Sequence, residues 1–315
     1  MQNYIEYEIA NPTFDNLGYV VAMANLKDKH DRSAPSNYHW KILKCRMIIF
    51  SNSSILACPD KSEAKKVHII FNKIGKDYDQ LNSLFLKFSL IQDGAIKKVS
   101  LEAYQMCFHY SLTARIAPTW NTLGYNYYIN NRNFLTNKGP QEGVKYNISV
   151  SEHSTILQLK PIKINLIQSD ETYEPGEYVR VLPSLNKAVI DDFYEILPQA
   201  GDFKSYKDLR RHWKNIHGYR LPDTENSHYY GVRFWRGESF TYPNICLVRN
   251  FPIMTTMPKS LEKLVIGRFL NTLRNKFSSF LGIHLNILRT RSENNDPTAE
   301  EVNTQAISLC TPTQI

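Results

Sequence analysis

The residues that could do chemistry in this chain are spread thinly along it. Nine histidines occur without a local cluster, and His212 and His217 lie five positions apart. In an α-helix that spacing places two side chains on different faces, whereas a chelating pair needs a spacing of four. Asp191 and Asp192 are neighbours, and neighbouring helical residues point apart, which indicates a solvated face rather than a paired acid and base. The sequence therefore predicts no metal site, no cofactor and no catalytic residue.

The cysteines add no reactive motif. Cys45, Cys58, Cys107, Cys246 and Cys310 are widely separated, and none belongs to a Cys-x-x-Cys pair, which excludes a zinc ribbon or a thioredoxin-like site. No phosphate-binding loop, dinucleotide fingerprint, nucleophile elbow or kinase signature is present. The odd cysteine count indicates a reducing compartment, and no stretch has the composition of a signal peptide or a spanning helix. We expect an intracellular protein, nuclear or cytoplasmic, without a membrane partner.

Positive charge is gathered in the second half of the chain. The 315 residues carry a formal net charge of +8. Residues 204–220 hold six Lys or Arg against one acid, and residues 259–291 hold seven against one. Such clustering is typical of a nucleic-acid-binding surface, although it also occurs on ordinary solvated helices. The predicted nucleic-acid-binding residues are Lys204, Lys207, Arg210, Arg211, Lys214, Arg233 and Arg236.

The first part of the chain has the periodicity of a mixed α+β domain. We predict this domain for residues 1–168, followed by a polar, Pro-containing junction at residues 169–176. Apolar alternation and β-branched runs predict strands at 4–9, 18–25, 67–71, 125–129, 146–150 and 162–166. Apolar residues at helical spacing predict helices at 38–50, 77–88 and 101–112, the last capped by Ser100.

The second part reads as a smaller, more helical domain over residues 177–291. Helices are predicted at 185–197 and 205–218, then a hairpin over 229–247 and a long C-terminal helix over 261–281. Ser205 and Asp208 form a capping box, Trp213 lies on the buried stripe, and Gly218 closes the second helix. This helix–helix–hairpin order resembles a winged helix, whose second helix could enter a major groove. The acidic tail, residues 292–315, is expected to be disordered.

Three segments resemble an uncharacterised animal protein family. They are residues 111–121 (SLTARIAPTWN), residues 205–213 (SYKDLRRHW) continued by 218–222 (GYRLP), and residues 240–246 (FTYPNIC); residues 182–184 also fit. The family is typified by a vertebrate open reading frame on chromosome 18 and carries a domain of unknown function. The resemblance brings no activity, cofactor or catalytic residue to this chain.

The motif residues also have an architectural interpretation. Pro118 ends a helix and Trp120 anchors the turn that follows, while Pro243 indicates an edge strand or a bulge. Tyr242 lies on the hairpin with Tyr229, Tyr230 and Trp235, and such aromatic side chains form a core, a protein interface or a platform for stacked bases. Arg115 lies in an apolar setting, so we expect a buried partner for it.

Two functions remain open at this stage. The first is a non-enzymatic interaction or scaffold protein with an unknown protein partner. The alternative is a protein that binds nucleic acid, in chromatin or as RNA, through the basic second domain. The two differ in salt dependence, because binding to phosphates weakens steeply as salt rises.

Overall fold

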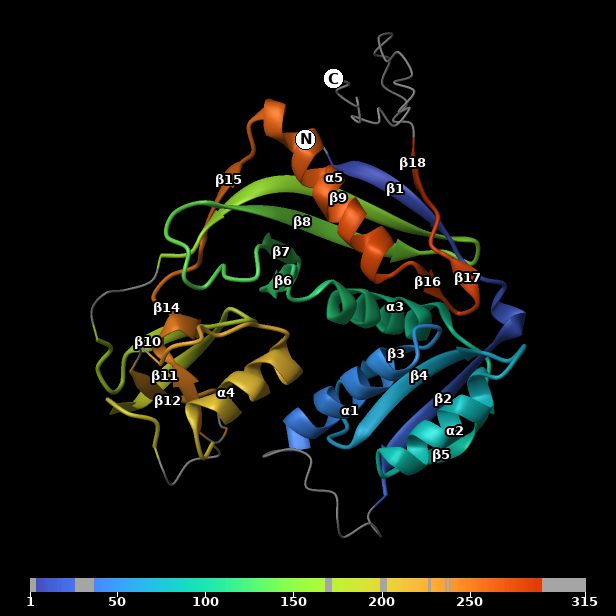
Figure 1. The fold of residues 1–315 in the computed structure, drawn as a ribbon, viewed down its shortest axis with the longest axis horizontal. Coiled ribbons are helices and arrows are strands. Elements are labelled where there is room, and N and C mark those ends of the chain that lie inside the picture. Colours follow the sequence, from blue (N-terminus) through green and yellow to red (C-terminus); the bar gives the residue numbers. More distant parts are fainter. Residues whose placement is uncertain are drawn as a thin grey trace, which may run out of the picture.

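The computed structural model describes residues 4–25, 37–167, 172–198, 203–225, 228–235, 237 and 239–290. Within these residues the strands form four sheets, and five α-helices pack against them. Every strand pair among them is antiparallel. The three larger sheets form three lobes around a central helix (Figure 1).

The largest sheet has seven strands and joins both ends of the described chain. Its central strand β9 pairs with β8 along one side and with β1 and β15 along the other, and β18 extends the sheet beyond β1. The strands are β1 (Ile5–Ala10), β6 (Trp120–Leu123), β7 (Tyr127–Asn130), β8 (Gln141–Val150), β9 (Ser154–Asn165), β15 (Ile253–Thr256) and β18 (Ile287–Arg289). Alternating burial along β8 and β9 confirms the strands predicted there.

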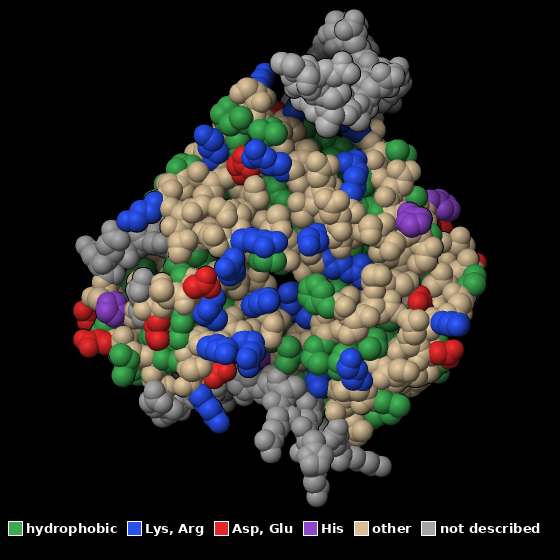
Figure 2. All heavy atoms as spheres, viewed as in Figure 1, with side chains coloured by type: hydrophobic (Ala, Val, Ile, Leu, Met, Phe, Trp, Pro, Cys, Tyr) green, Lys and Arg blue, Asp and Glu red, His purple; other side chains and the backbone are tan. Residues whose placement is uncertain are grey.

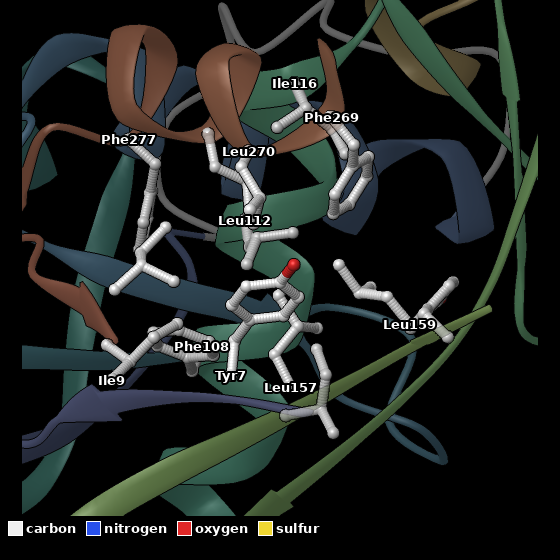
Figure 3. Close-up of a cluster of buried hydrophobic side chains, with 14 of the residues drawn as sticks. Tyr7, Ile9, Phe108, Leu112, Ile116, Leu157, Leu159, Phe269, Leu270 and Phe277 are labelled. Carbon is white, nitrogen blue, oxygen red and sulfur yellow. The ribbon is translucent and has the colours of Figure 1, made fainter. Parts of the chain in front are cut away.

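Two helices pack on this sheet and form the main core with it. They are α3 (Leu101–Ile116), whose N-cap Ser100 accepts a hydrogen bond from the amide of Ala103, and α5 (Lys259–Lys276). Apolar side chains from β1, β9, α3 and α5 point toward one another in this core (Figure 3). It includes Tyr7, Ile9, Phe108, Leu112, Ile116, Leu157, Leu159, Phe269, Leu270 and Phe277.

A second sheet lies on the other side of α3. Its strands, in the order β3-β4-β2-β5, are β2 (Leu17–Ala24), β3 (Leu56–Pro59), β4 (Lys66–Asn72) and β5 (Leu90–Lys97). Alternation along β4 sends Val67, Ile69 and Phe71 to the face covered by α1 (Asn37–Ser51) and α2 (Asp77–Lys87). Ile70 faces the opposite way and joins the core around α3. Helix α3 is therefore covered by a sheet on either side.

Arg115 links these layers near the end of α3. Its guanidinium donates to the carbonyl oxygens of Asn52, Ile55 and Ser279 at 3.4, 3.1 and 3.3 Å. The same group lies 4.9 Å from the centre of the Phe277 ring. Burial lowers the pKa of Arg115 to about 10, so it stays charged at neutral pH. The buried partner expected from the sequence is thus a set of three carbonyls and one aromatic ring.

The third lobe is a five-stranded sheet with a short helix against it. The strands, in the order β13-β12-β11-β10-β14, are β10 (Tyr178–Val181), β11 (Asn186–Tyr194), β12 (Tyr229–Arg233), β13 (Ser239–Pro243) and β14 (Leu247–Val248). The hairpin β12–β13 is confirmed, and β13 is the edge strand on which Pro243 was expected. Helix α4 (Tyr206–His212) continues into a π-helical turn, η2 (Trp213–His217).

The predicted fold class is wrong. Residues 185–197 were expected to form a helix but contain strand β11, so the helix–helix–hairpin unit and its winged-helix likeness do not exist. The prediction that a long C-terminal helix ends the fold is also wrong. Helix α5 stops at Lys276, and β16 (Ser279–Phe280), β17 (Ile283–His284) and β18 follow it. Strands in antiparallel sheets dominate the described residues.

The division into domains at 1–168 and 177–291 stays a prediction. Strands β15 and β18, from the later segment, pair with β9 and β1 of the earlier one. Residues 253–256 and 287–289 therefore complete the largest sheet. The tail, 292–315, lies outside the described residues. None of the helices in the described ranges has the length and apolar character needed to cross a membrane.

Candidate functional site

The lobe of β10–β14 meets the lobe of β2–β5 where η2 touches α1. Ser205 starts α4 by accepting a hydrogen bond from the amide of Asp208 at 3.2 Å, as predicted. Gly218 ends η2 with a φ of 76°, a left-handed conformation that suits glycine. Between Ser205 and Gly218 the helix contains a π turn, in which hydrogen bonds join residues five apart instead of four. Such turns often mark functional sites.

The π turn changes which histidines face each other. The prediction that His212 and His217 lie on different faces is wrong, because it assumed α-helical geometry throughout. Hydrogen bonds in a π-helix join residues five apart, so side chains with that spacing return to one side. The two imidazole rings have centroids 5.9 Å apart.

A third histidine reaches the same place from α1. The ring of His39 packs edge-on against His212, with centroids 4.6 Å apart, and lies 6.3 Å from His217. One ring nitrogen from each of the three lies within 4.8 Å of the other two. The sequence predicted no such group, because His39 lies more than 170 positions from the other two histidines and comes from a different lobe.

The electrostatics of the three rings favour neutral imidazole. Burial lowers the pKa of His39 to about 4. The pKa of His212 falls to about 3, first through burial and then through repulsion by His39. Burial, helped by the neighbouring histidines and Arg46, lowers the pKa of His217 well below its usual value. Near neutral pH all three therefore present nitrogen lone pairs rather than positive charge.

The three histidines line a cavity of about 400 Å³, which we call the histidine pocket. Most of its other walls are aromatic, and within the part of the chain that the structure describes no carboxylate lines it. These other walls are Pro183, Ser184, Asn186, Phe203, Trp213, Phe234, Phe240, Thr241 and Tyr242. An aromatic ring packs against each imidazole: Phe240 against His39, Phe203 against His212 and Trp213 against His217. The arrangement is typical of a mostly apolar ligand site with a few convergent polar groups.

A second hollow lies between α1, η2 and the ends of α2 and α3. Its volume is about 670 Å³, and we call it the basic groove. The described residues that line it include three cations and no acid; they are Leu43, Arg46, Met47, Phe50, Ser51, Lys87, Phe88, Ala117, Pro118, Lys214, Asn215 and Gly218. Lys and Arg side chains gather across the middle of one face of the molecule, between α5 and α4, where Asp and Glu are few (Figure 2).

The residues predicted to bind nucleic acid are only partly available. Three of them are engaged by acids: Arg210 by Asp223, Arg211 by Asp208 at 3.7 Å, and Arg233 by Asp191 at 3.0 Å. Lys204, just before α4, and Lys207, on α4, are exposed. Arg236 lies outside the described residues. Lys214 alone of the predicted residues lines the basic groove. Nucleic-acid binding by this set stays a prediction.

Several motif residues have structural positions beside the two hollows. Pro118 lines the basic groove just after α3, and Tyr242 lines the histidine pocket with its ring against Trp213. Trp120 is buried, packs edge-on against Phe269 and donates its indole N–H to Thr272 at 3.2 Å. These positions fit the architectural interpretation made from the sequence.

Gly218 lines the basic groove at a position where a single methyl group should cost stability. A Cβ atom there would lie 2.8 Å from the Cβ of Ala117, in addition to the left-handed backbone cost. We expect Gly218→Ala to lower the free energy of unfolding by about 2–4 kcal/mol in urea denaturation. The control is Gly75→Ala, where φ is also positive but no atom lies within 4 Å, with an expected loss of about 1–2 kcal/mol. Equal losses in the two variants would show that the close contact with Ala117 costs nothing.

The functional residues that the sequence analysis missed are contributed by α1 and α2. His39, Arg46 and Phe50 lie on α1, and Lys87 lies at the end of α2. Their helices were predicted correctly, and their chemistry was passed over because each residue looks ordinary within its own helix. The one signal available in the sequence was the composition of α1, which mixes cations with aromatic residues. In the structure this helix buries Lys41 and Lys44.

Comparison with known families gives the chain its classification. Residues 7–174 and 165–258 match the family described as "Domain of unknown function (DUF4708)". The chain belongs to this family, which confirms the resemblance to a domain of unknown function found from the three motifs. The family's description carries no activity.

Solved structures with related backbones are distant. The Argonaute of Marinitoga piezophila in complex with 5′ OH guide RNA aligns at 9% identity and a TM-score of 0.37, over 86% of this chain and 35% of that chain. A. aeolicus Argonaute aligns at 12% identity and a TM-score of 0.37, over 93% and 45%. The chain spans less than half the length of either protein. Similarity at this TM-score supports no statement about fold or function.

Proposed function

We propose that this protein binds single-stranded nucleic acid in the basic groove. The observation that carries the proposal is the lining itself: three cations and the exposed ring of Phe50 border a hollow of about 670 Å³, and none of the described residues that line it is acidic. Cations contribute affinity for the phosphate backbone, and aromatic rings provide surfaces on which bases stack. This combination is the usual composition of a site for single strands.

The cations are positioned to meet phosphates. Arg46, Lys87 and Lys214 come from three separate elements, α1, α2 and η2. Among the described residues, no carboxylate lies within ion-pair distance of any of them. The guanidinium of Arg46 is partly buried, and burial lowers its pKa. A phosphate in the groove would supply the negative charge that this desolvated cation lacks.

Phe50 offers a stacking surface next to these cations. It is 59% exposed, an unusual position for a phenylalanine, and its ring lies 5.3 Å from the guanidinium of Arg46. Phe88, beside Lys87, is buried in the core and forms part of the groove's apolar wall. A base stacked on an aromatic side chain contributes about 1–3 kcal/mol.

The groove favours a single strand over a duplex. Reading a duplex normally requires a helix or ribbon that enters the major groove. Helix α4, the predicted recognition helix, has only seven residues, and its two arginines are engaged by Asp223 and Asp208. Duplex recognition by this helix is therefore not part of the proposal.

Protein interaction, the first function predicted from the sequence, is the competing proposal. Its support is a set of highly exposed aromatic side chains, including Tyr125 and Trp235. Neither residue lines the basic groove or the histidine pocket. We therefore place nucleic-acid binding first.

The test is a fluorescence-anisotropy titration of labelled single-stranded RNA and DNA at low and moderate salt. We expect wild-type affinity to fall steeply with salt, and Lys87→Glu with Lys214→Glu to weaken binding at low salt by at least about 10-fold. Phe50→Ala should weaken binding by about 5-fold or more at every salt concentration, because it removes a stacking surface rather than a charge.

The matched control is Lys61→Glu with Lys65→Glu. These two lysines are exposed in the turn between β3 and β4 and line neither hollow, so the net charge changes equally while the groove is untouched. If both double variants lose affinity to the same extent, the contacts are diffuse and the groove is not the site. Absence of wild-type binding at low salt would refute nucleic-acid binding and leave a protein partner as the proposal to pursue.

A further inference from the structure

We propose that His39, His212 and His217 form a binding site for a divalent transition-metal ion, with zinc as the preferred occupant. The proposal stands on the convergence of three imidazoles from α1, α4 and η2, with one nitrogen from each within 4.8 Å of the others. Imidazole suits zinc, copper, iron and nickel. Three histidines with a vacant fourth direction are the ligand set of several catalytic zinc sites.

The geometry is close to what zinc requires. Zinc–nitrogen distances of about 2.0–2.1 Å in a tetrahedron place two ligand nitrogens roughly 3.3 Å apart. The nitrogens therefore need to approach one another by about 1.5 Å at most, which small ring rotations can supply. The packing of Phe240, Phe203 and Trp213 against the three imidazoles limits their orientations and so reduces the entropy lost on binding.

The π turn is the local feature that makes this site. An uninterrupted α-helix would leave His212 and His217 about 140° apart around the axis, too far to share an ion. Widening of the helix between Trp213 and His217 brings them to one side, facing the first turns of α1. A bound ion would therefore also join the two lobes, since α1 belongs to the β2–β5 lobe and η2 to the β10–β14 lobe.

The histidine pocket gives the ion an open position. It extends from the three rings over about 400 Å³, and none of the described residues that line it carries a carboxylate that could supply a fourth ligand. The ion's two positive charges would remain uncompensated by its three neutral ligands, which favours hydroxide or a small anion in the open position. The aromatic walls would exclude bulk water and strengthen that preference.

The experiment is a titration of the metal-stripped full chain with Co²⁺, followed by displacement with Zn²⁺. We expect one ion per chain and the intense visible absorption of four-coordinate cobalt, which zinc abolishes. Addition of azide should shift the spectrum, because the fourth position is open to a small anion. His212→Ala and His39→Ala should each weaken zinc affinity by at least about 100-fold.

The control variant is His153→Ala, which removes an exposed histidine between β8 and β9 and should bind cobalt like the wild type. Thermal melting without metal confirms that each variant folds, and zinc should raise the melting temperature of wild type and control only. Equal cobalt binding by His212→Ala and wild type, or only the weak absorption of six-coordinate cobalt, would overturn the site. A spectrum unmoved by azide would overturn the open position. Nucleic-acid binding at the basic groove is measured separately and does not enter these outcomes.

Discussion

Replacing Trp213 by alanine is expected to lower the free energy of unfolding by about 3–5 kcal/mol. The indole is 2% exposed and lies at the start of η2, where it packs against the rings of His217, Tyr219 and Tyr242. It belongs to the apolar core that holds α4 and η2 on the β10–β14 sheet. Removing it leaves a cavity that these neighbouring rings cannot fill without leaving their own contacts.

Urea denaturation of wild type, Trp213→Ala and Trp235→Ala measures this effect. Trp235 is 88% exposed, so its truncation should change the free energy of unfolding by no more than about 0.5 kcal/mol. The two variants remove the same side chain and differ in burial. A loss below 1 kcal/mol for Trp213→Ala would mean that the indole is a surface contact and that η2 is not anchored by it.

The elements that were predicted in the first half of the chain are those that follow simple periodicities, whereas strands β3, β5 and β6 were not predicted. The sequence shows alternating apolar and polar residues in β8 and β9 and apolar residues at helical spacing in α2 and α3. The structure has strands and helices at these positions. The pairing partners were not predictable in the same way. Strands β15 and β18 reach back to β9 and β1 over long sequence separations, and no local pattern specifies such a contact.

Strand β11 shows how a real pattern led to the wrong element. Its apolar residues include Val189, Ile190 and Phe193, which match helical spacing. In the structure its register against β12 shifts between Ile190 and Asp192, and such a bulge inserts an extra residue. The insertion changes which face later side chains occupy, so the alternation expected of a strand is lost. A bulged strand and a short amphipathic helix are then indistinguishable by spacing.

The candidate sites could be predicted only in part, for two physical reasons. Counting charges along a segment found the excess of cations but not the acids that meet them from elsewhere, such as Asp223 for Arg210 and Glu142 for Arg268. The two side chains of His212 and His217 were placed on different faces because α-helical geometry was assumed, whereas a π turn lies between them. The third histidine, His39, comes from another lobe and is brought near by tertiary packing alone.

Phe108 offers the second large effect, in the core shared by two lobes. We expect Phe108→Ala to lower the free energy of unfolding by about 3–5 kcal/mol. The ring is fully buried in the middle of α3 and meets Phe277 and Phe280 edge-on, each with centroids 5.5 Å away, while stacking on Tyr104 (Figure 3 shows Phe108 and Phe277). Since α3 lies between the seven-stranded and four-stranded sheets, the cavity would weaken both.

The same denaturation curve tests whether the two sheets unfold as a unit. A core shared through α3 predicts one transition for Phe108→Ala, with a lower midpoint and an unchanged dependence on urea concentration. Phe50→Ala, which truncates a 59% exposed ring on α1, is the control and should lose less than about 1 kcal/mol. Two separate transitions in Phe108→Ala would show that the sheets are stable apart, in which case the contact of α1 with η2 would join independently folding lobes.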